Sequence, residues 1–358
     1  MTFLSSSVKP QPVENDATTW YNTTTMRYLT YLGHDAPTNI ATDAWLLNQL
    51  RPDEPVFALW QNAKAVIVGR NQNTFSEVNQ AFVDAHQIQV VRRVSGGGAV
   101  YQDLGNLCFT FLIPVKSAAG VNFRQFVGPM HEALHSVGIN ADITGRNDLE
   151  INGKKISGNA QRYANGYLLH HGTLLWDVDV DMMVRALSVS AEKFIGKAAQ
   201  SMRARVGNIK DSAPASLNLA KFWEALAFFL TNYGKDDEIK LTAAQMSEIR
   251  QLRDRQFATW EWNYGASPQF TFSNHAKFVG GSIEVQANVE NGLVTAVNFV
   301  GDFLGVRDWR EIREEFIGAP FDPLAIQKIL DQNQGDQYFG SISASELAGL
   351  FANPAKVG

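Results

Sequence analysis

The chain has 358 residues, which is more than one compact core usually organises, so we expect two domains. Its formal net charge of -5 and the lack of an extended basic run argue against a nucleic-acid-binding surface. The single cysteine, Cys108, excludes a disulfide framework within the chain, and no apolar run reaches the roughly 18 residues that a membrane span needs. Without an apolar signal core at its N-terminus, the sequence predicts a cytoplasmic protein.

The first part of the chain combines a polar leader with alternating strands and helices. Residues 1–25 carry prolines and a threonine-rich run, and we expect them to be mobile. The apolar pattern then predicts a strand, a helix and two strands, at 26–32, 37–50, 55–60 and 65–69. Residues 74–87 follow as one predicted helix, for which Thr74 or Ser76 is available as the N-cap.

The middle of the chain contains a glycine-rich loop and a hairpin. Predicted strands at 87–94 and 106–115 flank the loop. Asn152-Gly153 lies between two strand-like runs and is a strong signal for a type I′ turn. The other predicted elements of this part are a helix, a strand and a helix, at 123–138, 167–178 and 218–233.

Around residue 255 the pattern changes to an alternation of apolar and polar residues, typical of a half-buried sheet. A turn at Asn291-Gly292 separates two such runs, and three short helix-like segments follow near 306–317, 323–333 and 343–352. We therefore predict three parts of the chain: a leader, a larger domain and a small accessory domain, at 1–25, 26–255 and 256–358.

The stretch "RRVSGGGAVYQDLGN", from Arg92 to Asn106, combines bare backbone with positive charge. Successive glycines can take positive φ and bring backbone N–H groups to an anion, and an arginine can grip a phosphate at two points. Neighbours on a strand point to opposite faces, so only one of Arg92 and Arg93 can face a ligand. For three glycines alone, a purely structural turn remains an alternative.

A second polar segment, "GRNDLEINGKKISGNA", surrounds the predicted hairpin. Lys154 and Lys155 follow the turn and should project to opposite faces, so one can be solvated while the other enters a pocket. Ser157-Gly158 then lets backbone lie close beside one of these amines. Two lysines near a turn can also be a solvated tip, and this alternative stays open.

Three further features carry possible chemistry. In "HHGTLL", His170 and His171 should face opposite sides of a strand, and for His171 a purely structural role remains open. "HEALH", at 131–135, matches a zinc-protease helix, but no third ligand follows it, so we set zinc chemistry aside. Cys108 lies mid-strand among apolar residues, which predicts an inert thiol.

Taken in order, these segments resemble the lipoate–protein ligase A family, together with "GKAAQSMRARVGNI" at 196–209 and "WEWNYG" at 260–265. The resemblance covers roughly residues 26 to 350. It implies an α+β fold: a biotin/lipoate-ligase-like catalytic domain with mixed sheets and flanking helices, plus a small α+β C-terminal domain. One departure is Asp43, where the family usually has glutamate, and we expect the shorter carboxylate to be tolerated.

The resemblance also implies a two-step reaction. Lipoate and Mg-ATP would give lipoyl-AMP and pyrophosphate, and the lipoyl group would then pass to a lysine of a lipoyl-domain acceptor. Such acceptors are the E2 subunits of 2-oxoacid dehydrogenases and the glycine-cleavage H protein. ATP and Mg²⁺ would act as co-substrate and activator, octanoate would be a second small-molecule substrate, and no tightly bound prosthetic group is expected.

Within this resemblance Lys155 is the candidate catalytic residue, because joining two anions needs positive charge where carboxylate meets α-phosphate. The residues expected to bind ATP or the adenylate are Arg93, Gly98, Ala99, Val100, Tyr101, Asn147, Asp148, Lys155, Arg203 and Arg205. Those expected to bind lipoate are Ser95, Gly96, Gly97, Gly98, Lys155 and His171. Asp148 is the candidate ligand for Mg²⁺, which prefers hard oxygen ligands.

Three rival functions remain. An octanoyl or lipoyl transferase of the same superfamily would work through an acyl-cysteine without ATP, and Cys108 is poorly placed for it. A biotin ligase usually carries a Gly-Arg-Gly-Arg loop, which differs from Ser95-Gly96-Gly97-Gly98. A non-catalytic binding protein could keep the fold, but Arg93 and Lys155 are both present.

Overall fold

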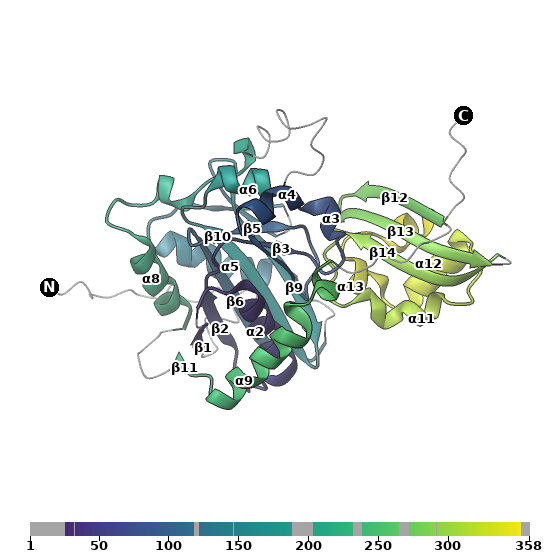
Figure 1. Ribbon diagram of the computed structural model, residues 1–358, viewed down its shortest axis with the longest axis horizontal. Helices are drawn as coiled ribbons and strands as arrows, with labels where there is room; N and C mark the ends of the chain where they lie inside the picture. Colours follow the sequence, from purple (N-terminus) through teal and green to yellow (C-terminus); the bar gives the residue numbers. More distant parts are fainter. Residues whose placement is uncertain are drawn as a thin grey trace, which may run out of the picture.

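The computed structural model describes residues 26–31, 33–117, 122–145, 147–187, 203–231, 238–264, 272–290 and 292–351. The predicted leader, and residues 196–202 of the segment at 196–209, lie outside the described residues. A larger body is built around an eight-stranded sheet and a smaller one around the strands labelled β12 to β14 in Figure 1.

The eight-stranded sheet is mixed, as predicted. Strand β1 pairs in parallel with both of its neighbours, whereas β10 pairs antiparallel on both sides. In spatial order the strands are β11 (Glu238–Ile239), β1 (Arg27–Thr30), β2 (Val56–Trp60), β6 (Asn106–Pro114), β10 (Tyr167–Leu175), β9 (Lys154–Ala164), β8 (Asp148–Ile151) and β7 (Asp142–Thr144).

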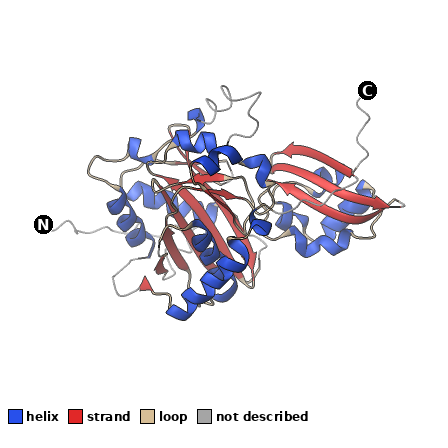
Figure 2. Ribbon diagram, viewed as in Figure 1, coloured by secondary structure: helices blue, strands red, loops and turns tan. Residues whose placement is uncertain are grey.

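Helices cover both faces of this sheet (Figure 2). On one face lie α2 (Ala36–Gln49) and α9 (Ala243–Leu252), and on the other α5 (Arg124–Ser136) and α8 (Leu219–Thr231). Strand β6 serves both cores because its side chains alternate: Phe109 packs with the α5 side and Cys108 with the α2 side. The buried position of Cys108 was predicted.

The glycine-rich loop belongs to a separate three-stranded sheet. It connects β4 (Gln89–Arg92) to β5 (Val100–Gln102), and β3 (Ala65–Val68) lies between them. Helices α4 (Gln80–Ala85) and α6 (Val180–Ala186) pack beside this sheet. The loop is therefore carried by a layer of its own, attached to the main sheet.

The single helix predicted at 74–87 is wrong, because two short helices occupy this range. Helix α3 (Thr74–Glu77) ends before Asn79, whose side-chain oxygen accepts the Phe82 amide and caps α4. An N-cap residue has non-helical backbone angles, so a cap inside the range breaks the helix in two.

The hairpin prediction is confirmed. Asn152 and Gly153 both have positive φ, at 51° and 74°, as a type I′ turn requires. They join β8 to β9, and the turn fixes which residues of β9 face the large domain's interior.

The smaller body is a three-stranded antiparallel sheet covered by short helices. Its strands are β12 (Phe272–Phe278), β13 (Gly281–Glu290) and β14 (Leu293–Gly301). The helices are η3 (Trp309–Ile312), α11 (Arg313–Phe316), α12 (Pro323–Gln332), α13 (Gly335–Phe339) and α14 (Ala344–Gly349). The three predicted helical segments are confirmed, and α13 was not predicted.

The segment between the two bodies packs on the larger one. It contains the π-helical turn η2 (Arg253–Phe257) and α10 (Trp260–Asn263). Phe257 is fully buried in the core beneath α2, and Trp262 packs against that core. The boundary at residues 255 and 256 stays a prediction, and this packing favours a later one.

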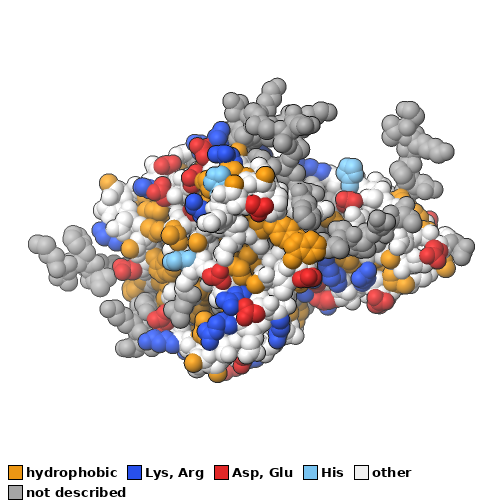
Figure 3. All heavy atoms as spheres, viewed as in Figure 1, with side chains coloured by type: hydrophobic (Ala, Val, Ile, Leu, Met, Phe, Trp, Pro, Cys, Tyr) orange, Lys and Arg blue, Asp and Glu red, His pale blue; other side chains and the backbone are white. Residues whose placement is uncertain are grey.

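The described residues contain no helix long and apolar enough to cross a membrane. On the face drawn in Figure 3, basic and acidic side chains are interspersed over both bodies. Residues 203–209 lead into another short helix, η1 (Ile209–Ser212). Its first residue, Ile209, is buried in the core on the α5 side of the main sheet.

Candidate active site

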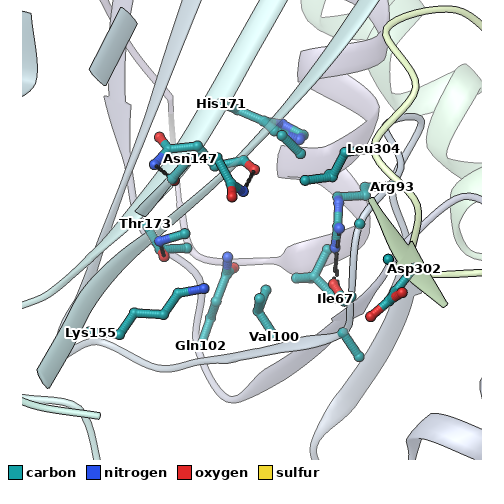
Figure 4. A pocket seen from close by; sticks show the side chains of 18 of the residues that line it. Ile67, Arg93, Val100, Gln102, Asn147, Lys155, His171, Thr173, Asp302 and Leu304 are labelled. Carbon is teal, nitrogen blue, oxygen red and sulfur yellow. Dashed lines mark hydrogen bonds between the residues drawn. The ribbon is translucent and has the colours of Figure 1, made fainter. Parts of the chain in front are cut away.

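A cavity of about 340 Å³ lies between the glycine loop, strands β9 and β10, and the smaller body. In Figure 4 Lys155 enters it from one side and Arg93 lies on the other. The predicted site residues that line it are Arg93, Gly97, Gly98, Ala99, Val100, Asn147, Lys155 and His171. Further lining residues, not predicted, are Ile40, Trp60, Ile67, Gln102, Gly158, Asn159, Ala160, Gly172, Thr173, Val279, Gly280, Gly281, Asp302 and Leu304.

Arg93 holds the glycine loop from within. Its guanidinium donates to the Ser95 hydroxyl and the Ile67 carbonyl, both at 3.1 Å, and to the carbonyls of Gly96 and Gly98. Burial, and then the charge of Arg92, lower the pKa of Arg93 to about 10, so the group stays cationic at neutral pH. The loop is thus folded around a buried positive charge that also reaches the cavity wall.

Arg92 points away from the cavity, as strand alternation predicts for one of the two arginines. Its side chain donates to the carbonyls of Gly69, Gln72 and Trp262 and to the hydroxyl of Thr74. These bonds tie the start of the loop to the segment that leads into the smaller body. The role of Arg92 in the described structure is therefore architectural.

Gly97 adopts a φ of +88°, a conformation that favours glycine. Its amide donates to the carbonyl of Phe303 at 3.2 Å, and an added Cβ would lie 2.7 Å from the side chain of Leu304. The loop therefore needs glycine here both for its backbone conformation and for contact with the smaller body.

A buried hydrogen-bond chain joins the loop to the main sheet. The Ser95 hydroxyl lies 2.6 Å from Nε2 of His171, and Nδ1 of His171 lies 2.7 Å from a carboxylate oxygen of Asp43. Asp43 also accepts from the hydroxyls of Tyr31 and Thr110, so the shorter carboxylate still has three partners. Ser95 is fully buried behind the lining, whereas the ring of His171 reaches the cavity.

Lys155 projects into the cavity, as Figure 4 shows, and its amine lies 2.8 Å from Oδ1 of Asp148. A Cβ at Gly158 would be 3.4 Å from this amine, so bare backbone lies beside it as predicted. Lys154 is exposed, and its stem lies under Gly207. The prediction that one lysine is solvated and the other enters a pocket is therefore confirmed.

Other predicted site residues lie outside the lining. Asp148 forms the ion pair with Lys155, and Tyr101 is buried in the core beside β3. A Cβ at Gly96 would lie 2.6 Å from the carbonyl oxygen of Phe303. Arg203 and Arg205 are exposed, and Arg203 pairs with Asp181 at 2.8 Å. Their segment nevertheless adjoins the site, because the amide of Gly207 donates to the Lys155 carbonyl.

The donor set offers no preformed metal cage. Among the residues that the structure describes, no three His, Cys, Asp or Glu side chains gather closely enough to hold a metal ion. The rings of His131 and His135 lie 4.4 Å apart, and Nε2 of His135 is bonded to the Ala141 carbonyl. Asp302 lines the cavity, and Asp148, the predicted metal ligand, is paired with Lys155.

The contribution of the smaller body was missed from the sequence. It supplies Val279, Gly280 and Gly281 from the β12–β13 turn, and Asp302 and Leu304 from the segment after β14. The sequence does contain a signal, since a Gly-Gly pair between two alternating runs permits close approach of backbone. Nothing in the spacing indicates which surface that turn approaches.

Comparison with known proteins covers both bodies. The family described as "Lipoyl protein ligase A/B catalytic domain" matches residues 35–230, and "Bacterial lipoate protein ligase C-terminus" matches residues 267–351. The chain is 36% identical over 318 residues to lipoate–protein ligase 1 of Staphylococcus aureus. The aligned region covers 89% of this chain and 97% of that protein. It is also 36% identical over 320 residues to a lipoate-protein ligase of Bacillus subtilis, covering 88% and 97%.

Solved structures show the same relationship. LipL1 of P. falciparum, in complex with lipoate, superposes with a TM-score of 0.71 at 25% identity, covering 86% of this chain and 94% of that one. A lipoate-protein ligase A bound with ATP superposes with a TM-score of 0.57 at 27% identity, covering 67% and 99%. The mixed-sheet fold with its small C-terminal domain is therefore the one expected from the sequence.

Proposed function

This chain belongs to the lipoate–protein ligase family, and from that premise we propose how its cavity carries out an ATP-dependent ligation. The enzyme activates lipoate with ATP to lipoyl-AMP and releases pyrophosphate. A lysine amine of an acceptor protein then attacks the acyl carbon, forms an amide and releases AMP. The observation that carries this proposal is the Lys155 amine, which lies beside bare backbone in the cavity that the glycine loop also lines.

The first step must bring two anions together. The lipoate carboxylate attacks the α-phosphorus, and negative charge builds on the phosphate oxygens as pyrophosphate leaves. Lys155 would hold the carboxylate in line and stabilise that charge, because its amine already points into the cavity. Asp148 would keep the amine over the cavity while the substrates bind and react.

The nucleotide would lie along the glycine loop. Gly98, Ala99 and Val100 line the cavity with backbone and small apolar side chains, and Asn147 faces them from the lysine segment. Arg93, which lines the cavity and is bonded to the carbonyls of Gly96 and Gly98, would attract the phosphates with its charge. Tyr101 would support the loop from its far side, and Arg203 and Arg205 would close over the adenylate.

Magnesium would enter with the nucleotide, which supplies most of its oxygen ligands. Two carboxylates belong to the described site: Asp302 lines the cavity, and Asp148, the predicted ligand, is paired with Lys155. When bound, the ion would neutralise phosphate charge.

The lipoyl chain would occupy the apolar end of the cavity. Ile40, Trp60 and Ile67 line the cavity and belong to one hydrophobic cluster, and His171, bonded to Asp43, is a further lining residue. Ser95, Gly96 and Gly97 would shape this slot from behind through the loop. An apolar slot with one polar mouth suits a fatty-acid-like tail with a carboxylate at its end.

The transferase alternative has no support at the site. Burial, and then the charge of Asp43, raise the pKa of the Cys108 thiol well above its ordinary value. The side chain is fully buried and its sulfur accepts from Asn106. An acyl-cysteine mechanism needs an exposed, readily ionised thiol.

The acceptor would be a lipoyl-bearing domain, from an E2 subunit or an H protein. A solved archaeal ligase is described together with its E2 lipoyl domain, which supports this class of partner. The test incubates the purified protein with lipoate, ATP, Mg²⁺ and each candidate apo-acceptor, and measures the acceptor's intact mass. We expect one lipoyl group per acceptor, with pyrophosphate released; transfer without ATP would overturn the proposal.

A further inference from the structure

His170 lies on the face of β10 opposite His171, enclosed by aromatic rings. Its ring stacks on Phe126 at 4.7 Å between centroids, and the rings of Phe109, Phe111 and Phe123 surround it. Burial, and then the neighbouring His171, lower the pKa of His170 well below its ordinary value. The imidazole is therefore neutral.

Both ring nitrogens of His170 are used. The Gln161 amide donates to Nδ1 at 3.0 Å, so the ring proton is on Nε2 and is donated to Oδ1 of Asn159 at 3.1 Å. A neutral imidazole has one donor and one acceptor, so these two bonds fix its tautomer. The fixed tautomer in turn determines which way the Asn159 amide faces.

Asn159 links His170 to the lysine segment through hydrogen bonds. Its Nδ2 donates to the Asn147 carbonyl at 2.7 Å, and Nδ2 of Asn147 donates back to the Asn159 carbonyl at 2.7 Å. Gly172 makes room for the bridge, because a Cβ there would lie 2.3 Å from Oδ1 of Asn159. The reciprocal bonds hold the residue directly before Asp148, and Asp148 holds the Lys155 amine.

We propose that Asn159, oriented by His170, is a positioning residue for Lys155. It fixes the Asn147–Asp148 turn and thereby places the Asp148 carboxylate where it holds the Lys155 amine over the cavity. This inference rests on the proposed role of Lys155 in adenylate formation. Nothing in it requires Asn159 to touch either substrate.

The main test replaces Asn159 with aspartate, which keeps the shape and the acceptor for His170 but removes the donor to the Asn147 carbonyl. Without substrates, limited labelling by acetic anhydride is followed by peptide mass spectrometry. Lys154 is the internal reference on the same strand. We expect the Lys155 to Lys154 labelling ratio to change several-fold in Asn159→Asp, because the turn that holds Asp148 loosens.

The kinetic arm measures pyrophosphate release against lipoate and ATP. We expect kcat to fall about 100-fold in Asn159→Asp, the size of effect that a misplacement of about 1 Å can have, with both KM values within about two-fold. His170→Phe keeps the ring packing and adds no charge near Lys155. It should change the labelling ratio and kcat in the same direction, by less.

Asn39→Asp is the matched control. Asn39 is a buried amide of the same domain that bridges to Asn62 at 2.8 Å, and the described part of the lysine segment forms no bond with it. We expect it to lower the thermal midpoint while the labelling ratio stays at the wild-type value. The midpoint of every variant is measured alongside.

Two results would overturn the proposal. If Asn159→Asp and His170→Phe lower the thermal midpoint but leave the labelling ratio and kcat within two-fold, Asn159 only supports the fold. If KM for lipoate or ATP rises tenfold while kcat is kept, Asn159 contacts substrate. A wild-type protein that releases no pyrophosphate would refute the proposed function instead, and the labelling ratio would still report on Lys155.

Discussion

The glycine loop and the lysine hairpin line the same cavity, yet they are held in different ways. The loop is folded around Arg93, whose guanidinium has four protein partners, and it is joined to the main sheet through Ser95 and His171. Lys155 is 41% exposed, and the ion pair that it forms with a described residue is with Asp148. One wall of the site is rigid, and the other presents a charge that can move.

This difference suits the two tasks of the site. A surface that binds nucleotide benefits from backbone held in place before the ligand arrives, since no ordering cost remains. A group that first meets a carboxylate and then follows charge onto a phosphate must change partners during the reaction. A half-exposed ion pair binds the amine only weakly, so Lys155 can shift toward a substrate anion while Asp148 still limits where the amine lies.

The largest expected effect is on the mobile wall. Lys155→Ala should lower the rate of pyrophosphate release about 100- to 1000-fold, because the charge that stabilises the developing anion is lost. Its thermal midpoint should stay near that of the wild type, since the ion pair is half-exposed. If this variant releases pyrophosphate at the wild-type rate, the movable charge of Lys155 is not what drives the first step.

The next effect is on the rigid wall and combines stability with activity. Arg93→Ala leaves the carbonyls of Ile67, Gly96 and Gly98 without their donor, and the free energy of unfolding should fall by roughly 3 kcal/mol. Urea unfolding measures this loss. Arg93→Lys keeps the positive charge but loses the several N–H donors of the planar guanidinium, so it should recover only part of the stability. Full recovery would show that charge alone holds the loop.

A pH series tests the support behind the lysine hairpin. The neutral ring of His170 faces Gln161, Asn159 and phenylalanine rings, and His171 is the titratable group whose charge acts on it. The folded-state pKa lies below the unfolded value of about 6.5, so the unfolded chain binds the extra proton and stability falls as pH drops below that value. One such group contributes at most about 1.4 kcal/mol per pH unit.

The measurement compares urea unfolding of the wild type and His170→Gln between pH 7 and pH 5. We expect a shallower loss of stability in the variant, which lacks the titrating ring. Equal slopes in the two proteins would show that His170 is not the neutral buried group that the structure indicates.

The neighbouring lysine gives a small expected effect. Lys154→Ala removes an exposed amine outside the cavity, and adenylate formation should stay within about two-fold of wild type. A loss as severe as that of Lys155→Ala would mean that the wrong neighbour was assigned to the cavity.

The smallest effect is expected at the thiol. Cys108→Ser changes a fully buried side chain that the proposed chemistry does not use, so ligation with ATP should continue within about two-fold. Loss of transfer in a variant that remains folded would favour an acyl-cysteine mechanism instead.

The amino-acid sequence determined much of the local structure by itself. The type I′ turn at Asn152-Gly153 and the opposite faces of Lys154 and Lys155 follow from turn chemistry and the two-residue period of a strand, which act between neighbours. The glycine loop and its two arginines could be picked out for the same reason. The break at Asn79 was missed because the apolar pattern continues across a capping residue.

Only the tertiary structure decided what these residues meet. Strand alternation predicted that one arginine would turn away, but it could not show that Arg93 would bind the loop's own carbonyls. It also gave no sign that Asn159 would reach Asn147, or that residues 279–281 would close the cavity. Such contacts join segments far apart in the chain, and their partners are fixed by the packing of strands and domains, which no local pattern encodes.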